Sequence, residues 1–165
     1  MNLILTMAGK YSRFRDDGYK FPKYLLPYGN RSILSEILNQ IQSHLFSNIF
    51  LIANKEDEPF LGHVRKIIEC YKIPIRNLLI TEDTNGQAET ASIAIGMIPP
   101  SDSPIIFHNI DTILYNRNIH NIKIALENHD GYIDVFKSNN HNYSYVVAKN
   151  DVVSLISEKI LVSDI

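Results

Sequence analysis

Four short runs along the chain have the composition of β-strands. They are rich in Ile, Leu and Phe, and they comprise residues 3–7, 48–53, 76–81 and 104–108. The run at 48–53 has no alternation of polar and apolar positions, which is typical of a strand covered on both faces of a parallel sheet. We therefore predict four strands, of which the second at least is fully buried.

The segments between these runs have the spacing of amphipathic helices. Apolar residues recur every three or four positions over residues 33–45, 56–71 and 87–98. Ser32 is placed to cap the first of these helices, and Pro99 and Pro100 end the third. Strands that alternate with helices favour right-handed βαβ units. The expected fold is a Rossmann-like three-layer α/β/α arrangement with a mainly parallel sheet.

The last third of the chain has a different pattern. A helix is expected over residues 118–128, followed by strands at 131–137 and 143–148 that the polar turn 138–142 joins into a late β-hairpin. No linker, repeat or low-complexity tract interrupts the sequence. We expect one domain over residues 1–165, a length that suffices for a core without disulfides or metals.

Composition and charge exclude several classes of function. The chain is 45% hydrophobic and 21% charged, as in ordinary globular proteins, and has no apolar stretch of the roughly 20 residues that a membrane span needs. A net charge of −2 argues against a nucleic-acid surface. The first residues lack the basic and cleavage regions of a signal peptide, and Cys70 is the only cysteine. We therefore expect a cytoplasmic protein that binds neither nucleic acid nor membrane.

The segment after the first strand concentrates positive charge. Ala8 and Gly9 end the strand, and five cations then follow against two carboxylates, Asp16 and Asp17; the cations are Lys10, Arg13, Arg15, Lys20 and Lys23. Backbone N–H groups and cations that converge in this way suit a multiply charged anion. The Walker A spacing and the dinucleotide fingerprint both lack their glycines here, so the segment predicts a phosphate site of another kind.

The residues of this segment resemble the signature of the sugar-phosphate nucleotidyltransferases. In that family the first strand ends in Ala-Gly, a Ser/Thr-Arg pair follows, and Pro-Lys comes about ten residues later, ahead of Leu-Pro. The matching residues here are Ala8-Gly9, Ser12-Arg13, Pro22-Lys23 and Leu26-Pro27. Gly18-Tyr19-Lys20 is similar to the branch that serves bacterial capsule and other surface-polysaccharide pathways. The resemblance implies the nucleotide-diphospho-sugar transferase fold.

Further matches follow in the family's order along the chain. Gly86-Gln87 resembles the glycine-led helix start beside the nucleotide base, Asp111 resembles the aspartate that binds Mg²⁺, and Lys159 resembles the lysine that approaches the sugar phosphate. The resemblance implies that Arg13 and Lys23 are catalytic, that Ala8, Gly9, Gly86 and Gln87 bind the nucleotide, that Asp111 binds the metal, and that Lys159 binds the substrate.

Two departures from the family pattern stand beside these matches. The first is Tyr11, which occupies the place of a second glycine. The second is length: the family continues beyond residues 163–164 into a further strand, a second metal-binding aspartate and helices. We therefore expect the family's C-terminal part to be missing.

The resemblance implies an enzyme that transfers NMP from a nucleoside triphosphate to a sugar phosphate or similar phosphorylated metabolite, with Mg²⁺ as cofactor. The alternative is a non-catalytic domain that binds a nucleotide or sugar nucleotide and derives from such an enzyme. A glycosyltransferase is disfavoured because no Asp-x-Asp motif is present. The sequence does not identify the base, the acceptor or the oligomeric state, and a homo-oligomer is possible.

Overall fold

The structure is a computed structural model that describes residues 1–100, 103–140 and 142–158. The chain divides into two compact units, Met1–Ile124 and Ala125–Ile165. The expectation of a single domain stays a prediction.

A parallel sheet of four strands forms the centre of the first unit. The strands are β1 (Asn2–Met7), β4 (Asn48–Asn54), β5 (Leu78–Thr81) and β6 (Ile105–Asn109). Their order is β5-β4-β1-β6, and every neighbouring pair is parallel. Every residue of β1 is buried, because this strand lies between two others and beneath helices on its faces. The predicted mainly parallel sheet is confirmed.

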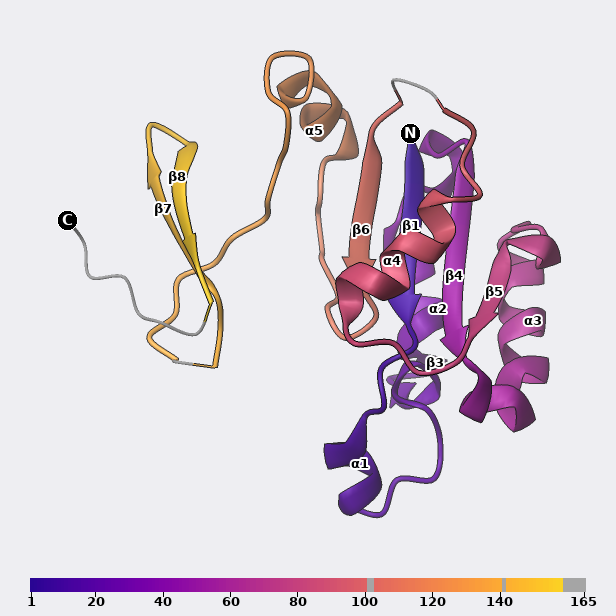
Figure 1. The fold of residues 1–165 in the computed structure, drawn as a ribbon. Helices are drawn as coiled ribbons and strands as arrows, with labels where there is room; N and C mark the ends of the chain where they lie inside the picture. The colour runs from indigo at the N-terminus through magenta and orange to yellow at the C-terminus, as the bar shows by residue number, and fades with distance from the viewer. Residues whose placement is uncertain (101–102, 141, 159–165) are drawn as a thin grey trace. The chain divides into compact units, whose positions relative to one another are not determined.

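The helices of the first unit cover both faces of the sheet. In Figure 1, α4 (Gln87–Ile95) lies in front of β1 and β4, while α2 (Ile33–Gln40) lies behind the sheet. Two further helices are α3 (Leu61–Cys70) and α5 (Ile119–Ala125). Ala94 of α4 packs on Ile4, Phe50 and Ile52 in a buried cluster. The opposite side chains of the strands face the other layer, since successive strand residues point to opposite faces.

The observed helices are shorter than the sequence predicts. The first ends at Gln40 and is followed by a 3₁₀ turn, Ser43–Leu45. The second begins as the 3₁₀ helix η3 (Lys55–Phe60), which contains Pro59. Proline lacks the N–H that an α-helix needs in its interior. Another 3₁₀ turn, Ile75–Asn77, precedes β5.

The segment after β1 contains short elements that the sequence did not predict. These are α1 (Ser12–Asp16), the 3₁₀ turn η1 (Lys23–Leu25), and the two-residue strands β2 (Pro27–Tyr28) and β3 (Arg31–Ser32). Figure 1 shows α1 beyond the carboxyl end of β1. The predicted phosphate-binding segment therefore lies at the edge where open parallel sheets bind ligands.

The second unit contains an antiparallel hairpin, as predicted; the strand expected at 143–148 corresponds to its first strand, but the partner strand follows it in the chain instead of preceding it. Its strands are β7 (Tyr145–Lys149) and β8 (Val152–Ser157). The strand expected at 131–137 is wrong, because those residues form neither helix nor strand. Asn150 and Asp151 make the turn with φ of 50° and 62°. Positive φ at both central residues is typical of a two-residue hairpin, and Asn and Asp tolerate it.

Among the described residues, no helix is both long enough and apolar enough to span a membrane.

Candidate functional site

A cavity of about 420 Å³ lies at the carboxyl edge of the sheet, where β1 and β6 end side by side. Its walls come from the segment after β1, from the loop that leads into α4, and from the residues that follow β6. Six of the predicted site residues line it, namely Ala8, Gly9, Lys23, Gly86, Gln87 and Asp111. The topology thus gathers residues that are far apart in the sequence.

Lys23 and Asp111 form an ion pair in this cavity. The Lys23 Nζ atom lies 2.9 Å from Oδ2 of Asp111, and the two side chains are 23% and 47% exposed. The Lys23 ammonium also lies 5.3 Å from the ring centroid of Phe14 in α1. Burial raises the pKa of the Asp111 carboxyl, but the hydrogen bond and charge of Lys23, together with hydrogen bonds from Thr112 and the backbone, outweigh burial and leave the pKa below its usual value. An ion pair of opposite charges therefore lies at the cavity wall.

Gln87 stands at the start of α4 and contacts two strands. Its Nε2 donates to Thr6 Oγ1 at 2.9 Å and also to Asn109 Oδ1. Gly86 is the N-cap of α4, and its carbonyl accepts the hydroxyl of Thr90 at 3.1 Å. The two Gln87 bonds connect the start of α4 to the ends of β1 and β6, which fixes one wall of the cavity.

Most of the cations after β1 are paired with carboxylates. Lys10 Nζ lies 2.6 Å from Asp83 Oδ2, and Arg15 Nη2 lies 3.0 Å from Glu56 Oε2. The positive excess expected from the local sequence is thus reduced by acids from other segments, which a local count does not include.

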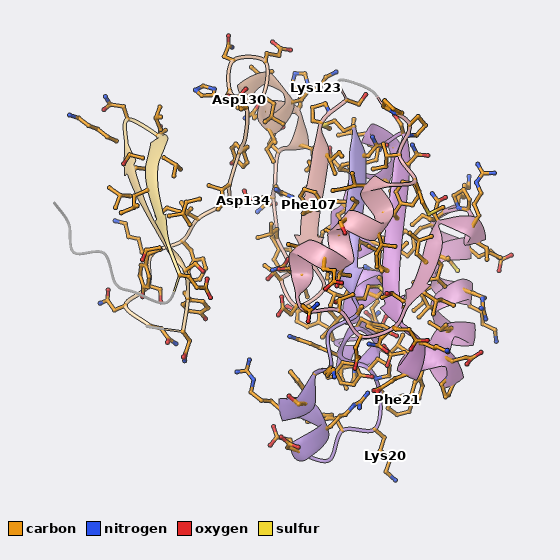
Figure 2. The ribbon with its side chains drawn as sticks, viewed as in Figure 1. Lys20, Phe21, Phe107, Lys123, Asp130 and Asp134 are labelled. Carbon is orange, nitrogen blue, oxygen red and sulfur yellow. The ribbon has the colours of Figure 1, made fainter. Side chains whose placement is uncertain are left out.

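Arg13 and Lys20 form no ion pair within the part of the chain that the structure describes. Arg13 lies exposed in α1 and does not line the cavity. Lys20 is also exposed, and Figure 2 shows its side chain extending away from the loop that carries it.

Sequence reasoning missed the buried residue Asp57. Its carboxylate accepts hydrogen bonds from the phenols of Tyr11 and Tyr24, both of which line the cavity. Asp57 lies in a segment that the sequence assigned to an ordinary helix, where a carboxylate is most often exposed. No spacing pattern relates it to either tyrosine, so only the tertiary structure reveals the contact.

Lys159 lies outside the described residues. Its neighbour Glu158, in the second unit, accepts a hydrogen bond from Ser144.

Comparison with known proteins gives one partial match in sequence and broad matches in fold. The bifunctional protein GlmU of Methanococcus aeolicus is 35% identical over 65 residues, which are 39% of this chain and 16% of that protein. No protein-family model matches the sequence.

Two solved structures have the same fold. The nucleoside-diphosphate-sugar pyrophosphorylase of Vibrio cholerae is 25% identical, with a TM-score of 0.75 over 99% of this chain and 69% of that one. The 4-diphosphocytidyl-2C-methyl-D-erythritol synthase of Anaerococcus prevotii is 16% identical, with a TM-score of 0.60 over 96% of this chain and 63% of that one. The second likeness concerns the fold alone.

The chain thus spans roughly two thirds of each structural neighbour and a small part of its relative in sequence. The predicted Rossmann-like α/β/α fold is confirmed. The predicted resemblance is confirmed as well: over part of its sequence and in its fold, the chain is similar to the sugar-phosphate nucleotidyltransferases.

Proposed function

We propose that the protein transfers NMP from a nucleoside triphosphate to a sugar phosphate or similar phosphorylated metabolite and releases pyrophosphate. In this reaction an oxygen of the acceptor phosphate forms a bond to the α-phosphorus. The bond from that phosphorus to the bridging oxygen breaks, and the electron pair leaves with pyrophosphate. The observation that carries the proposal is the meeting of Lys23 and Asp111 in a cavity at the carboxyl edge of the sheet.

The protein's contribution is to position the reactants and to neutralise charge, as in other phosphoryl transfers. Lys23 lies between the α-phosphate and the acceptor phosphate and eases the approach of the two anions. Arg13 holds the triphosphate tail from α1, and Lys159 binds the acceptor phosphate. The backbone at Ala8 and Gly9 lies against the nucleotide, while Gly86 and Gln87 form the wall on the side of the base.

The Lys23–Asp111 ion pair opens when the substrates bind. Both members are partly exposed, so the exchange of partners costs little. Lys23 then contacts phosphate oxygens, and the Asp111 carboxylate becomes available to a cation.

The donors at the cavity fit Mg²⁺ that arrives with the nucleotide. Within the described ranges, no group of three His, Cys, Asp or Glu side chains could hold a metal ion. Mg²⁺ often uses one or two carboxylates together with substrate phosphates and water, and the half-buried carboxylate of Asp111 supplies such a ligand. When bound, the ion neutralises charge that develops on the phosphate oxygens. Mg²⁺, the capsule pathway and the cytoplasmic location stay predictions.

A second candidate is a non-catalytic domain that binds a nucleotide or sugar nucleotide. Tyr11 favours it, because a side chain stands at the cavity where the family has a glycine. Such a domain would show ligand-induced thermal stabilisation without turnover.

Pyrophosphate release separates the two candidates. CTP, UTP, dTTP, GTP and ATP are each combined with a panel of sugar 1-phosphates and Mg²⁺. We expect turnover with at least one combination and a loss of about 100-fold or more in Lys23→Ala, since one electrostatic contact to a transition state contributes on that order.

Lys20→Ala is the matched control, because it removes an exposed lysine of the same segment and should change the rate by less than about 3-fold. Thermal stabilisation by a nucleotide with no turnover in any combination would favour the binding domain.

A further inference from the structure

The carboxylate of Asp57 holds two tyrosines that belong to the segment after β1. Asp57 is fully buried in η3. Its Oδ1 accepts the Tyr11 hydroxyl, and its Oδ2 accepts the Tyr24 hydroxyl at 2.9 Å. Burial raises the pKa of the Asp57 carboxyl, and the two phenols oppose that rise. Burying a carboxylate costs free energy unless the group is hydrogen-bonded. The bonds from the two phenols therefore offset the cost of burying Asp57.

The two tyrosines stand at opposite ends of the predicted phosphate-binding segment. Tyr11 follows Gly9 and Lys10, and Tyr24 directly follows Lys23. One buried carboxylate therefore fixes both the beginning and the end of this segment. Tyr11 has a φ of 38°, in the left-handed region that a tyrosine rarely adopts, so a contact must hold it there. Its bond to the buried Asp57 carboxylate is one such contact.

Further side chains of η3 contact the same segment. The Arg15 guanidinium lies 4.7 Å from the ring centroid of Tyr11 and donates to Glu56 Oε2 at 3.0 Å. The rings of Phe21 and Phe60 pack edge to face with centroids 5.6 Å apart. Residues of η3 at three positions thus hold the segment from its start to the turn before Lys23.

We propose that Asp57 is a positioning residue of the site: by holding Tyr11 and Tyr24 it orders residues 11–24 and places Lys23 where it contacts the phosphates of the nucleotide. The inference rests on the proposed function. Asp57 itself does not line the cavity, so it acts only through the residues that it holds.

Asp57→Asn tests the role with little change in size. An amide has one acceptor oxygen in place of two, so one phenol loses its acceptor. Tyr11→Phe and Tyr24→Phe remove one hydroxyl each and are the milder variants, should Asp57→Asn not fold. Tyr71→Phe is the matched control, because the Tyr71 hydroxyl donates to the Ser35 carbonyl at 2.7 Å, away from the cavity.

Two measurements are made on each folded variant. Hydrogen exchange of the backbone amides of residues 11–25 reports the order of the segment. Calorimetry with inorganic tripolyphosphate and Mg²⁺ reports the affinity of the site without requiring the correct base or acceptor. In Asp57→Asn we expect exchange in this segment alone to accelerate about 10-fold and the tripolyphosphate Kd to rise about 10-fold, since one charged hydrogen bond is lost. Tyr71→Phe should leave both unchanged.

The outcomes separate the two proposals. Suppose that the wild-type protein binds tripolyphosphate, and that Asp57→Asn, Tyr11→Phe and Tyr24→Phe bind it with the same affinity. The positioning role is then overturned, while the proposed function stands. Faster exchange with unchanged affinity also overturns it, because Asp57 would then order the segment without serving the site. If the wild-type protein does not bind tripolyphosphate at all, the proposed function and the positioning role both fail.

Discussion

At the scale of single residues, loss of the Lys23–Asp111 ion pair should change stability little, although loss of Lys23 should reduce turnover strongly. Lys23 keeps the pKa of Asp111 below the usual value of 3.8 despite burial. A carboxyl whose pKa is lowered by folding stabilises the native state above the unfolded pKa, and this stability is lost as the pH falls through the folded pKa. Lys23→Ala should therefore destabilise the protein at neutral pH by about 1 kcal/mol or less, as for other partly exposed pairs.

Urea unfolding at several pH values checks this prediction. The difference in free energy of unfolding between wild type and Lys23→Ala should be constant from about pH 7 to about pH 5 and should shrink below about pH 4. Lys20→Ala, an exposed lysine without an ion pair among the described residues, should show no such pH dependence. A difference that grows as the pH falls would contradict the pairing.

Tyr11 shows where prediction from single residues fails. The sequence identifies it only as a departure from a glycine position. In the structure its left-handed backbone costs about 1–2 kcal/mol, and a hydrogen bond to a charged acceptor contributes about 1.5–3 kcal/mol, so the bond to Asp57 can offset the strain. The compensating partner lies 46 positions away in the sequence, beyond the reach of any local motif.

At the scale of secondary-structure elements, the cap of α2 gives a quantitative prediction. Ser32 has extended backbone geometry, and its hydroxyl accepts the N–H of Ser35 at 3.2 Å, so the cap predicted from the sequence is confirmed. Ser32→Ala should lower the free energy of unfolding by about 1 kcal/mol, the usual cost of losing such a cap. Denaturant unfolding measures the change, with Ser32→Asn as a variant that keeps a cap. Equal losses in both variants would exclude capping as the cause.

The late hairpin illustrates why some elements are displaced from their predicted positions. Apolar content and the polar stretch 138–142 placed the predicted strands at 131–137 and 143–148. The decisive signal was the dipeptide Asn150-Asp151, whose residues tolerate positive φ at both positions of a tight turn. Turn chemistry, rather than hydrophobicity, therefore determined which strands pair. Helix ends were displaced for a similar reason, because Pro59 converts the predicted start of a helix into a 3₁₀ segment.

At the scale of the whole molecule, the order of elements was predictable because it depends on repeated patterns. Alternating strands and helices leave few topologies for a parallel sheet, and the carboxyl edge of that sheet is where the candidate residues had to meet. Six residues that the resemblance selected do meet there. The ion pairs of Lys10 with Asp83 and of Arg15 with Glu56 could not be predicted from the sequence, because these acids follow other strands.

The division into two units predicts which activities can be separated. Among the residues that the structure describes, those that line the cavity all belong to Met1–Ile124, and so do the four strands of the parallel sheet. A fragment of residues 1–127, which retains the buried Ile119 and Ile122 of α5, should fold and bind tripolyphosphate with Mg²⁺ within about 3-fold of the full chain. It should not transfer a nucleotide if Lys159 binds the acceptor phosphate as proposed, because the fragment lacks that lysine.

Circular dichroism, calorimetry and pyrophosphate release measure the three properties of this fragment. A folded fragment that loses tripolyphosphate affinity by more than about 10-fold would show that the second unit contributes to the nucleotide site, because a loss of that size equals at least one charged hydrogen bond. Full turnover by the fragment would instead remove Lys159 from the reaction and require the acceptor phosphate to bind within the first unit.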